Sequence, residues 1–229
     1  MSEWTIAAAQ YDDSRSDAAQ NIASHLRFIT AAARQRCNIL LFPELSLAGT
    51  ANGLLPFSGD SALLKPLLEA AVRYQITIIA GAPLLINGAM QSGVAIFSPD
   101  NAAPLAFYQG RSACLSPHSP GAKHFPASAD GSELDPRASL LATGTCTRGC
   151  QQQQSIQRLQ RLAHKYAIAV LKSNYASGSA LWDDNGQLIV RADAGELLLI
   201  GRRRAGSWEG DIIPLHECLS PIDEIACGA

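Results

Sequence analysis

A short apolar segment, Ile39 to Phe42, ends at a proline, and the next residue along the chain is Glu44. Four apolar residues that end at a proline are typical of a buried strand. Glu44 is therefore expected where such a strand leaves the core, a position at which a carboxylate requires a partner. It either pairs with an arginine or caps a turn, or it acts as a general base.

Apolar periodicity predicts that strands and helices alternate along much of the chain. The expected strands cover residues 5–10, 39–42, 77–80, 94–97, 105–108, 139–145, 168–172, 179–183, 187–191 and 196–200. Ser16 or Asp17 is expected to cap a first helix, and further helices are expected at residues 62–74 and 155–166. Helices that alternate with strands, with hairpins closing each half, indicate α/β layers with mixed sheets.

Two parts of the chain show little apolar pattern. From Gln109 to Arg137, Pro, Ser, Gly and Ala dominate, and we expect a long loop region there. After Gly201 the pattern is again weak, so residues 201–229 are expected as a tail that packs loosely or across a partner subunit. A chain of 229 residues suits one domain, which we place at residues 1–200.

Composition limits the partners that this chain can have. The net charge of −2 argues against binding to nucleic acid or to an anionic membrane. No apolar run reaches the length of a membrane span and no secretory signal is visible, so we expect a cytoplasmic protein. The six cysteines are expected as free thiols, and no cofactor or metal is expected because no motif for one is present.

Three stretches of the sequence resemble the nitrilase, or carbon–nitrogen hydrolase, superfamily. The first runs from WTIAAAQ through a capped helix to NILLFPELSLAG, and the second is the hairpin GVAIFSPDNAAPLAFY. The third, AHKYAIAVLKSNYASGSALWDDNGQLIVRA, resembles a family helix, strand and Asp-x-x-Gly hairpin. The resemblance covers most of residues 1–200. It implies a nitrilase-like αββα sandwich of two mixed sheets with outer helices, and it implies pairing into a homodimer.

The resemblance also implies a reaction, the hydrolysis of small linear amides or nitriles. In the family, a cysteine thiolate attacks the substrate carbon and forms a thioester, while a glutamate moves the protons. A lysine stabilises the oxyanion. The glutamate that follows Phe-Pro in the family motif corresponds to Glu44, which the resemblance therefore makes the general base.

The family lysine has no counterpart in this sequence. Counting from either side of its motif puts Gly110 or Ser112 at the lysine position. Arg111 lies between them and is the only cation nearby, so it is either a substitute that binds the oxyanion or a surface loop residue. Lys123 resembles a residue of a later family loop and is not expected to be catalytic.

The family cysteine has two candidate positions. Cys146 follows an expected strand and precedes an expected helix, as the family nucleophile does, and a helix N-terminus favours a thiolate. A second alignment, anchored on the stretch that ends at Asn174, makes residues 139–145 the strand after the nucleophile. That alignment puts Ser128 or a gap in the cysteine's place. Both alignments imply that the family core is shortened between about residues 125 and 174.

Three hypotheses about function follow. In the first, the chain is an active hydrolase in which Glu44, Cys146 and Arg111 serve as base, nucleophile and oxyanion cation. In the second, it is a pseudoenzyme that keeps the scaffold for ligand binding or assembly. In the third, it is an internally deleted form of a longer enzyme, in which a missing strand leaves its sheet neighbours unpaired.

Overall fold

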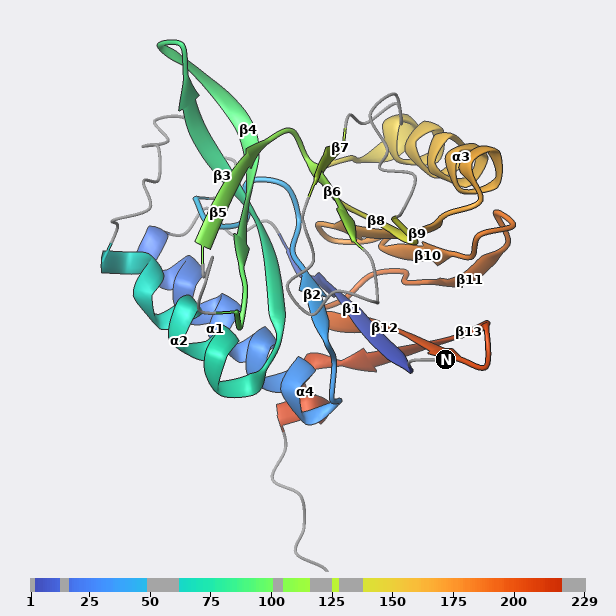
Figure 1. Cartoon of the computed structure of the whole chain (residues 1–229), viewed down its shortest axis with the longest axis horizontal. Helices are drawn as coiled ribbons and strands as arrows, with labels where there is room; N and C mark the ends of the chain where they lie inside the picture. The colour runs from blue at the N-terminus through green and yellow to red at the C-terminus, as the bar shows by residue number, and fades with distance from the viewer. Residues whose placement is uncertain are drawn as a thin grey trace, which may run out of the picture.

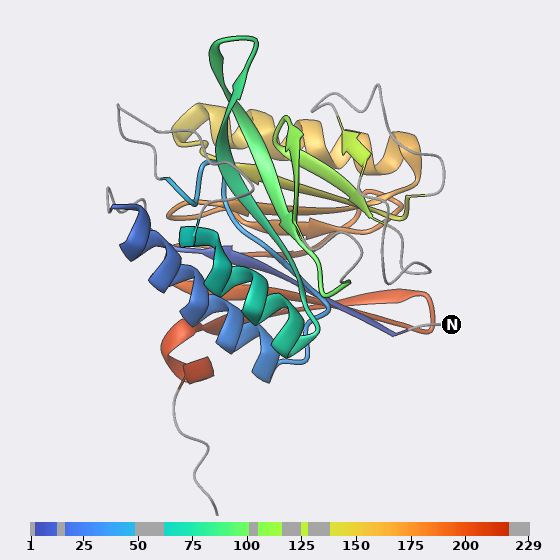
Figure 2. The same ribbon diagram turned by 60° about the vertical axis from the view of Figure 1, so that its left-hand side comes forward.

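The computed structural model describes residues 3–12, 17–48, 62–100, 105–115, 125–127 and 138–219, which form four layers (Figures 1 and 2). Two mixed β-sheets face each other. Helices α1 (Ala18–Arg34) and α2 (Lys65–Tyr74) cover the outer face of one sheet, and α3 (Gly149–Tyr166) covers that of the other. The expected sandwich of two mixed sheets with outer helices is confirmed.

The first sheet contains seven described strands in the order β13-β12-β1-β2-β3-β4-β5. Their bounds are β1 (Trp4–Gln10), β2 (Ile39–Leu41), β3 (Thr77–Ile86), β4 (Ala89–Phe97), β5 (Leu105–Gln109), β12 (Leu197–Arg204) and β13 (Ser207–Pro214). β2 is parallel to β1 and β3, because α1 and α2 carry the chain back across the sheet. The other neighbours are antiparallel. Asp17, one of the two residues predicted to cap α1, accepts from the N–H of Gln20.

The second sheet contains six described strands in the order β11-β10-β9-β8-β6-β7. Their bounds are β6 (Ser112–Leu115), β7 (Phe125–Ala127), β8 (Leu140–Thr145), β9 (Ala169–Asn174), β10 (Ala180–Trp182) and β11 (Leu188–Arg191). α3 joins the parallel strands β8 and β9. β6 pairs directly with β8, so the sheet is continuous through its described strands. None of these strands therefore shows the gap beside it that the hypothesis of an internally deleted enzyme requires.

Apolar side chains fill the three spaces between the layers. Leu41 and Leu171 belong to the cluster between the two sheets. Leu40, next along β2, points to the opposite face and packs with Phe28 beneath α1 and α2. Leu159 belongs to the third cluster, which attaches α3 to the second sheet. β2 is therefore covered on both faces, which explains its uninterrupted apolar sequence.

Strand β3 is longer than the sequence predicted, because it continues through Gly81 and Pro83 to a hairpin turn. Pro83 has no N–H to donate, but β2 pairs with β3 only as far as Ile79, so this side of β3 has no strand neighbour at the proline. The hairpin turns at Asn87 and Gly88, whose φ angles of 51° and 78° suit a two-residue turn.

Two expectations about weakly patterned regions were wrong. Part of the expected loop after Gln109 is strand β6, whose four residues are all buried. The expected tail does not begin at residue 201, because that residue lies within β12. β13 then pairs with β12 along its whole length, and α4 (Leu215–Leu219) packs against α1. Most residues of β13 are exposed or half-buried, which explains why its apolar pattern is weak.

Helix α3 begins at Gly149, six residues before the start that the sequence indicated, and it includes the glutamine tract of residues 151–154. Glutamine is a good helix former, so this tract extends the helix without adding to its apolar face. None of the helices in the described ranges is long and apolar enough to cross a membrane. The five described cysteines form no disulfide with one another, and Cys227 lies outside the described residues.

Candidate functional site

Residues 42–48 follow β2, carry Glu44 and are packed between one glycine of each sheet. A Cβ atom added to Gly81 of β3, or to Gly144 of β8, would lie 2.6 Å or 2.7 Å from a backbone carbonyl oxygen of this segment. Side chains do not approach the backbone so closely, so both positions require glycine. The two sheets therefore fix the backbone around Glu44.

His25 of α1 connects the same segment to the first sheet through a chain of hydrogen bonds. Its Nδ1 donates to the carbonyl of Asn21 (2.7 Å), which leaves Nε2 to accept from Ser46 Oγ (3.0 Å). Ser46 Oγ in turn accepts from the N–H of Gly81 (3.1 Å). The buried imidazole stacks on Phe42 with 4.0 Å between ring centroids. Burial lowers the pKa of His25 to about 4, so the ring is neutral at pH 7.

Glu44 forms an ion pair with Arg111. Arg111 Nε lies 3.0 Å from Glu44 Oε1, and the exposed fractions of the two side chains are 50% and 12%. The carbonyl of Arg111 accepts from the N–H of Gly144 (3.0 Å), which attaches this residue to β8. The hydroxyl of Tyr175, after β9, donates to the carbonyl of Glu44 (3.0 Å). Arg111 is half-exposed, but it is not an isolated loop residue, because it pairs with the motif glutamate.

Cys146 lies in the turn between β8 and α3, and Asn174 holds that turn. The Oδ1 atom of Asn174 accepts from the Thr145 hydroxyl (2.8 Å) and the Thr147 N–H (2.9 Å). The Nδ2 atom of Asn174 donates to the Thr147 carbonyl (2.8 Å). Cys146 is half-buried and packs against the apolar cluster that contains Phe42. The cysteine is thus held beside the cluster that underlies the Glu44 segment.

The three sequence candidates therefore lie on connected elements. Glu44 and Arg111 are in direct contact, and the Arg111 backbone is hydrogen-bonded to β8, the strand that precedes Cys146. The alternative nucleophile position, Ser128, lies outside the described residues.

Lys172 is a buried cation that the sequence analysis did not single out. It lies on β9, has no exposed surface, and donates from Nζ to Thr147 Oγ1 at 3.4 Å. Burial, together with the smaller effect of the positive charge of Arg191, lowers the pKa of Lys172 to about 8. The sequence contained a signal for it, because Lys172 directly follows the apolar run of residues 167–171, and a lysine is unusual at such a buried position.

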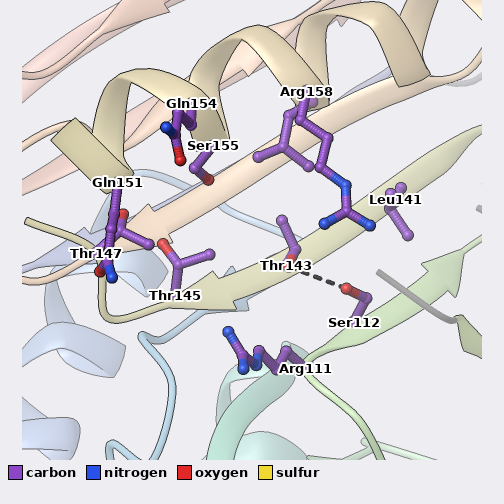
Figure 3. A pocket seen from close by; sticks show the side chains of 11 residues that line it. Arg111, Ser112, Leu141, Thr143, Thr145, Thr147, Gln151, Gln154, Ser155 and Arg158 are labelled. Atoms are coloured by element: carbon purple, nitrogen blue, oxygen red, sulfur yellow. Dashed lines mark hydrogen bonds between the residues drawn. The ribbon is translucent and has the colours of Figure 1, made fainter. Parts of the chain in front are cut away.

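A cavity of about 300 Å³ opens between α3 and the outer face of the second sheet. Figure 3 shows Arg158 extending from α3 towards Thr143 and Ser112, with Arg111 on the opposite side of these two residues. The Ser112 hydroxyl donates to Thr143 Oγ1 (2.9 Å), and both side chains are buried. Thr147, which bonds to the buried Lys172, also lines the cavity. Most of the residues that line the cavity are polar, and two of them are arginines.

Comparison with known proteins bears on both the fold and the sequence motifs. A CN-hydrolase superfamily protein from Xanthomonas campestris is 16% identical, with a TM-score of 0.73 over 90% of this chain and 92% of that chain. An amidase from Nesterenkonia sp. AN1, in a double mutant complexed with acrylamide, is 17% identical, with a TM-score of 0.70 over 90% and 92% of the two chains. The two-sheet sandwich is thus a nitrilase-like fold.

The sequence itself matches the family model for carbon-nitrogen hydrolases over residues 5–111. This segment contains Glu44 and ends at Arg111, the two residues of the ion pair. The family match and the shared fold together confirm the resemblance to the nitrilase, or carbon–nitrogen hydrolase, superfamily.

Proposed function

We propose that this protein is a carbon–nitrogen hydrolase that acts on small linear amides or nitriles through a thioester on Cys146. Glu44 is the general base and Arg111 is the oxyanion cation. The observation that carries the proposal is the 3.0 Å contact between Arg111 Nε and Glu44 Oε1. This contact joins the motif glutamate to the one cation that the sequence offers near the position of the family lysine.

The position of Cys146 is supported by its neighbours on β8 and β9. Gly144, two residues before the cysteine, donates its N–H to the carbonyl of Arg111 (3.0 Å). Asn174 fixes the residues on either side of the cysteine with hydrogen bonds of 2.8–2.9 Å. A nucleophile held in a rigid turn loses little conformational entropy when it attacks, which is a requirement for efficient nucleophilic catalysis.

The reaction divides into two steps. Glu44 accepts the thiol proton of Cys146, the thiolate attacks the amide carbon, and the protonated glutamate returns the proton to the leaving amine. Water, deprotonated by Glu44, then hydrolyses the thioester and releases the acid. Arg111 uses Nε to orient Glu44, and its two terminal nitrogens remain to stabilise the oxyanion in each step.

The solved neighbours support a small amide as the substrate class. The Nesterenkonia amidase is described in complex with acrylamide, and acrylamide adds to its active-site cysteine in another variant. The Xanthomonas protein carries an arsenic adduct in its active site.

Two further expectations belong to this proposal, a homodimer and a cytoplasmic location. Light scattering coupled to size exclusion tests the dimer.

A second candidate function is ligand binding without catalysis. It is favoured by one observation, that Arg111 also lines the cavity beneath α3, which neither Glu44 nor Cys146 lines. If the guanidinium serves that cavity alone, Glu44 is only its counterion and no thioester forms.

Thiol labelling distinguishes the two functions. Iodoacetamide is applied at pH 7 and the modified peptides are mapped over time, with the exposed Cys150 as an internal control. The hydrolase proposal predicts that Cys146 reacts faster than Cys150, although it is less exposed. It also predicts that Glu44→Gln slows the reaction of Cys146 at least tenfold and leaves that of Cys150 unchanged. Equal reactivity of Cys146 in the two proteins supports the non-catalytic function.

A further inference from the structure

The cavity beneath α3 has an excess of positive charge and of hydrogen-bond donors. Its lining contains two arginines, and the other lining side chains are uncharged, mostly threonine, serine and glutamine. The charge of Arg111 is offset by Glu44 at 3.0 Å. Arg158 has no such counterion, because no carboxylate in the described part of the chain lies within ion-pair distance of it. The guanidinium of Arg158 is therefore available to a ligand.

A buried lysine adds a second, independent observation. Lys172 of β9 pairs in register with Thr143 of β8, so the two side chains lie on the same face of the second sheet, towards α3. Lys172 is fully buried, yet the one bond that its Nζ makes to a described residue is the 3.4 Å contact with Thr147 Oγ1. An ammonium group has three protons to donate, and burying it without a counterion is costly.

The remaining polar groups are arranged around these cations. Ser112 and Thr143 are bonded to each other, and Figure 3 shows them facing the end of Arg158. The Thr143 hydroxyl accepts this bond and therefore keeps its own proton to donate to a ligand oxygen. Gln151, in the first turn of α3, lines the same cavity, where the amide dipoles of an 18-residue helix favour negative charge.

We propose that this cavity binds a small anion, the carboxylate or phosphate group of a metabolite. Arg158 and the Thr143 hydroxyl donate to the anion, Ser112 orients that hydroxyl, and Lys172 balances the charge of the anion from behind Thr147. A guanidinium suits both groups, because its parallel N–H donors match two oxygens of a carboxylate or a phosphate. The site adjoins the residues of the proposed hydrolysis, because Arg111 lines it, but neither Glu44 nor Cys146 does.

Thermal unfolding of the full chain tests this site with simple ions as probes. Inorganic phosphate and acetate are each titrated against sodium chloride at equal ionic strength. We expect one of the two ions to produce a saturable rise in melting temperature that chloride does not produce, and the more effective ion identifies the group. Equal effects of phosphate, acetate and chloride would overturn the proposal.

Variants locate the effect in the cavity. Arg158→Gln is expected to weaken the apparent affinity for the effective ion at least tenfold. Arg161 is also exposed on α3 but does not line the cavity, so Arg161→Gln removes the same charge and is expected to leave the affinity unchanged. An identical response of the two variants contradicts the proposal. Cys146→Ala should retain the full response, which separates this site from the fate of the hydrolase proposal.

Lys172→Met provides a readout that a purely structural lysine would not give. The substitution removes a buried charge, so the melting temperature without the ion is expected to rise. The additional rise caused by the ion is expected to be reduced in the same variant, because the charge that balances the anion has been lost. A Lys172→Met protein that responds to the ion as the wild type does contradicts the role of Lys172.

Discussion

Arg111 Nε and Glu44 Oε1 lie 3.0 Å apart, and this contact joins the end of β2 in the first sheet to the start of β6 in the second. The sequence has no lysine in the family pattern, and an arginine one position away from it reaches the motif glutamate. A guanidinium is longer and flatter than an ammonium group, so it reaches the carboxylate with Nε and keeps its terminal nitrogens for a second contact.

Arg111 is expected to matter more for activity than for stability. Arg111→Met should lower kcat/KM by about 10²–10³-fold, the usual effect of removing an oxyanion donor. Its half-exposed side chain limits the loss of unfolding free energy to about 1 kcal/mol or less. Arg111→Lys should recover part of the activity. Kinetics and thermal unfolding check both effects, and a loss of stability without any loss of activity would assign Arg111 a structural role only.

His25 is expected to make the protein sensitive to acid. Its folded-state pKa of about 4 lies below the ordinary value of 6.5, so the unfolded state binds the proton more tightly. The stability that depends on the neutral ring is complete above pH 6.5 and falls as the pH drops towards 4, by on the order of 3 kcal/mol.

Denaturant unfolding at pH 4 to 7 measures this effect. His25→Gln is less stable than the wild type at pH 7, and the difference should shrink towards pH 4. His216→Gln, at an exposed histidine, should follow the wild-type profile. Parallel profiles for the wild type and His25→Gln would show that His25 does not titrate as its burial requires.

Lys172 is expected to have the opposite profile at alkaline pH. Its folded-state pKa of about 8 lies below the ordinary value of 10.5, so stability should increase as the pH rises from about 8 to 10.5. At pH 7, Lys172→Met should be more stable than the wild type by on the order of 3 kcal/mol, and the difference should vanish near pH 10.5.

The comparison of the wild type with Lys172→Met also cancels the contribution of Cys37 to the pH dependence of stability. Burial raises the pKa of that thiol to about 12, which lowers stability above pH 9 equally in both proteins. A stability difference that does not change between pH 7 and pH 10.5 contradicts the prediction for Lys172.

Gly81 is expected to be required for the position of Glu44. A Cβ atom there would lie 2.6 Å from the Pro43 carbonyl oxygen, so Gly81→Ala must displace the segment and should cost about 1–3 kcal/mol. Gly88→Ala meets no atom within 4 Å but has a φ of 78°, and it should cost about 1 kcal/mol through backbone strain alone. Activity should fall in Gly81→Ala and remain in Gly88→Ala, as a kinetic assay of the two variants would show.

The sequence predicts the parts of this fold that depend on local pattern. The cap at Asp17, the strand before Glu44 and the hairpin β4–β5 all follow from neighbouring residues. The pairing of Glu44 with Arg111 could not be predicted, because it depends on how two sheets pack and not on local periodicity. The site roles of Glu44, Arg111 and Cys146 remain a proposal that builds on this contact.

Two strands were predicted wrongly, β6 and β3, and in both cases the cause lies in how strands pair. β6 was missed because its sequence, Ser112-Ala-Cys-Leu115, is short and lacks β-branched residues, although the sheet buries all four. The expected strand at residues 77–80 ended too early, because β3 continues through Pro83, and a proline is tolerated where one side of a strand has no partner. Both cases depend on strand neighbours that a single sequence does not reveal.

The most direct test of the central claim is the release of ammonia from a panel of small linear amides, including acrylamide. We expect hydrolysis of at least one amide by the wild type, and a loss of about 10³-fold or more in both Cys146→Ala and Glu44→Gln. Cys150→Ala, at the exposed neighbouring cysteine, should keep the wild-type rate. Hydrolysis that survives in Cys146→Ala, or no hydrolysis of any amide by the wild type, would contradict this claim.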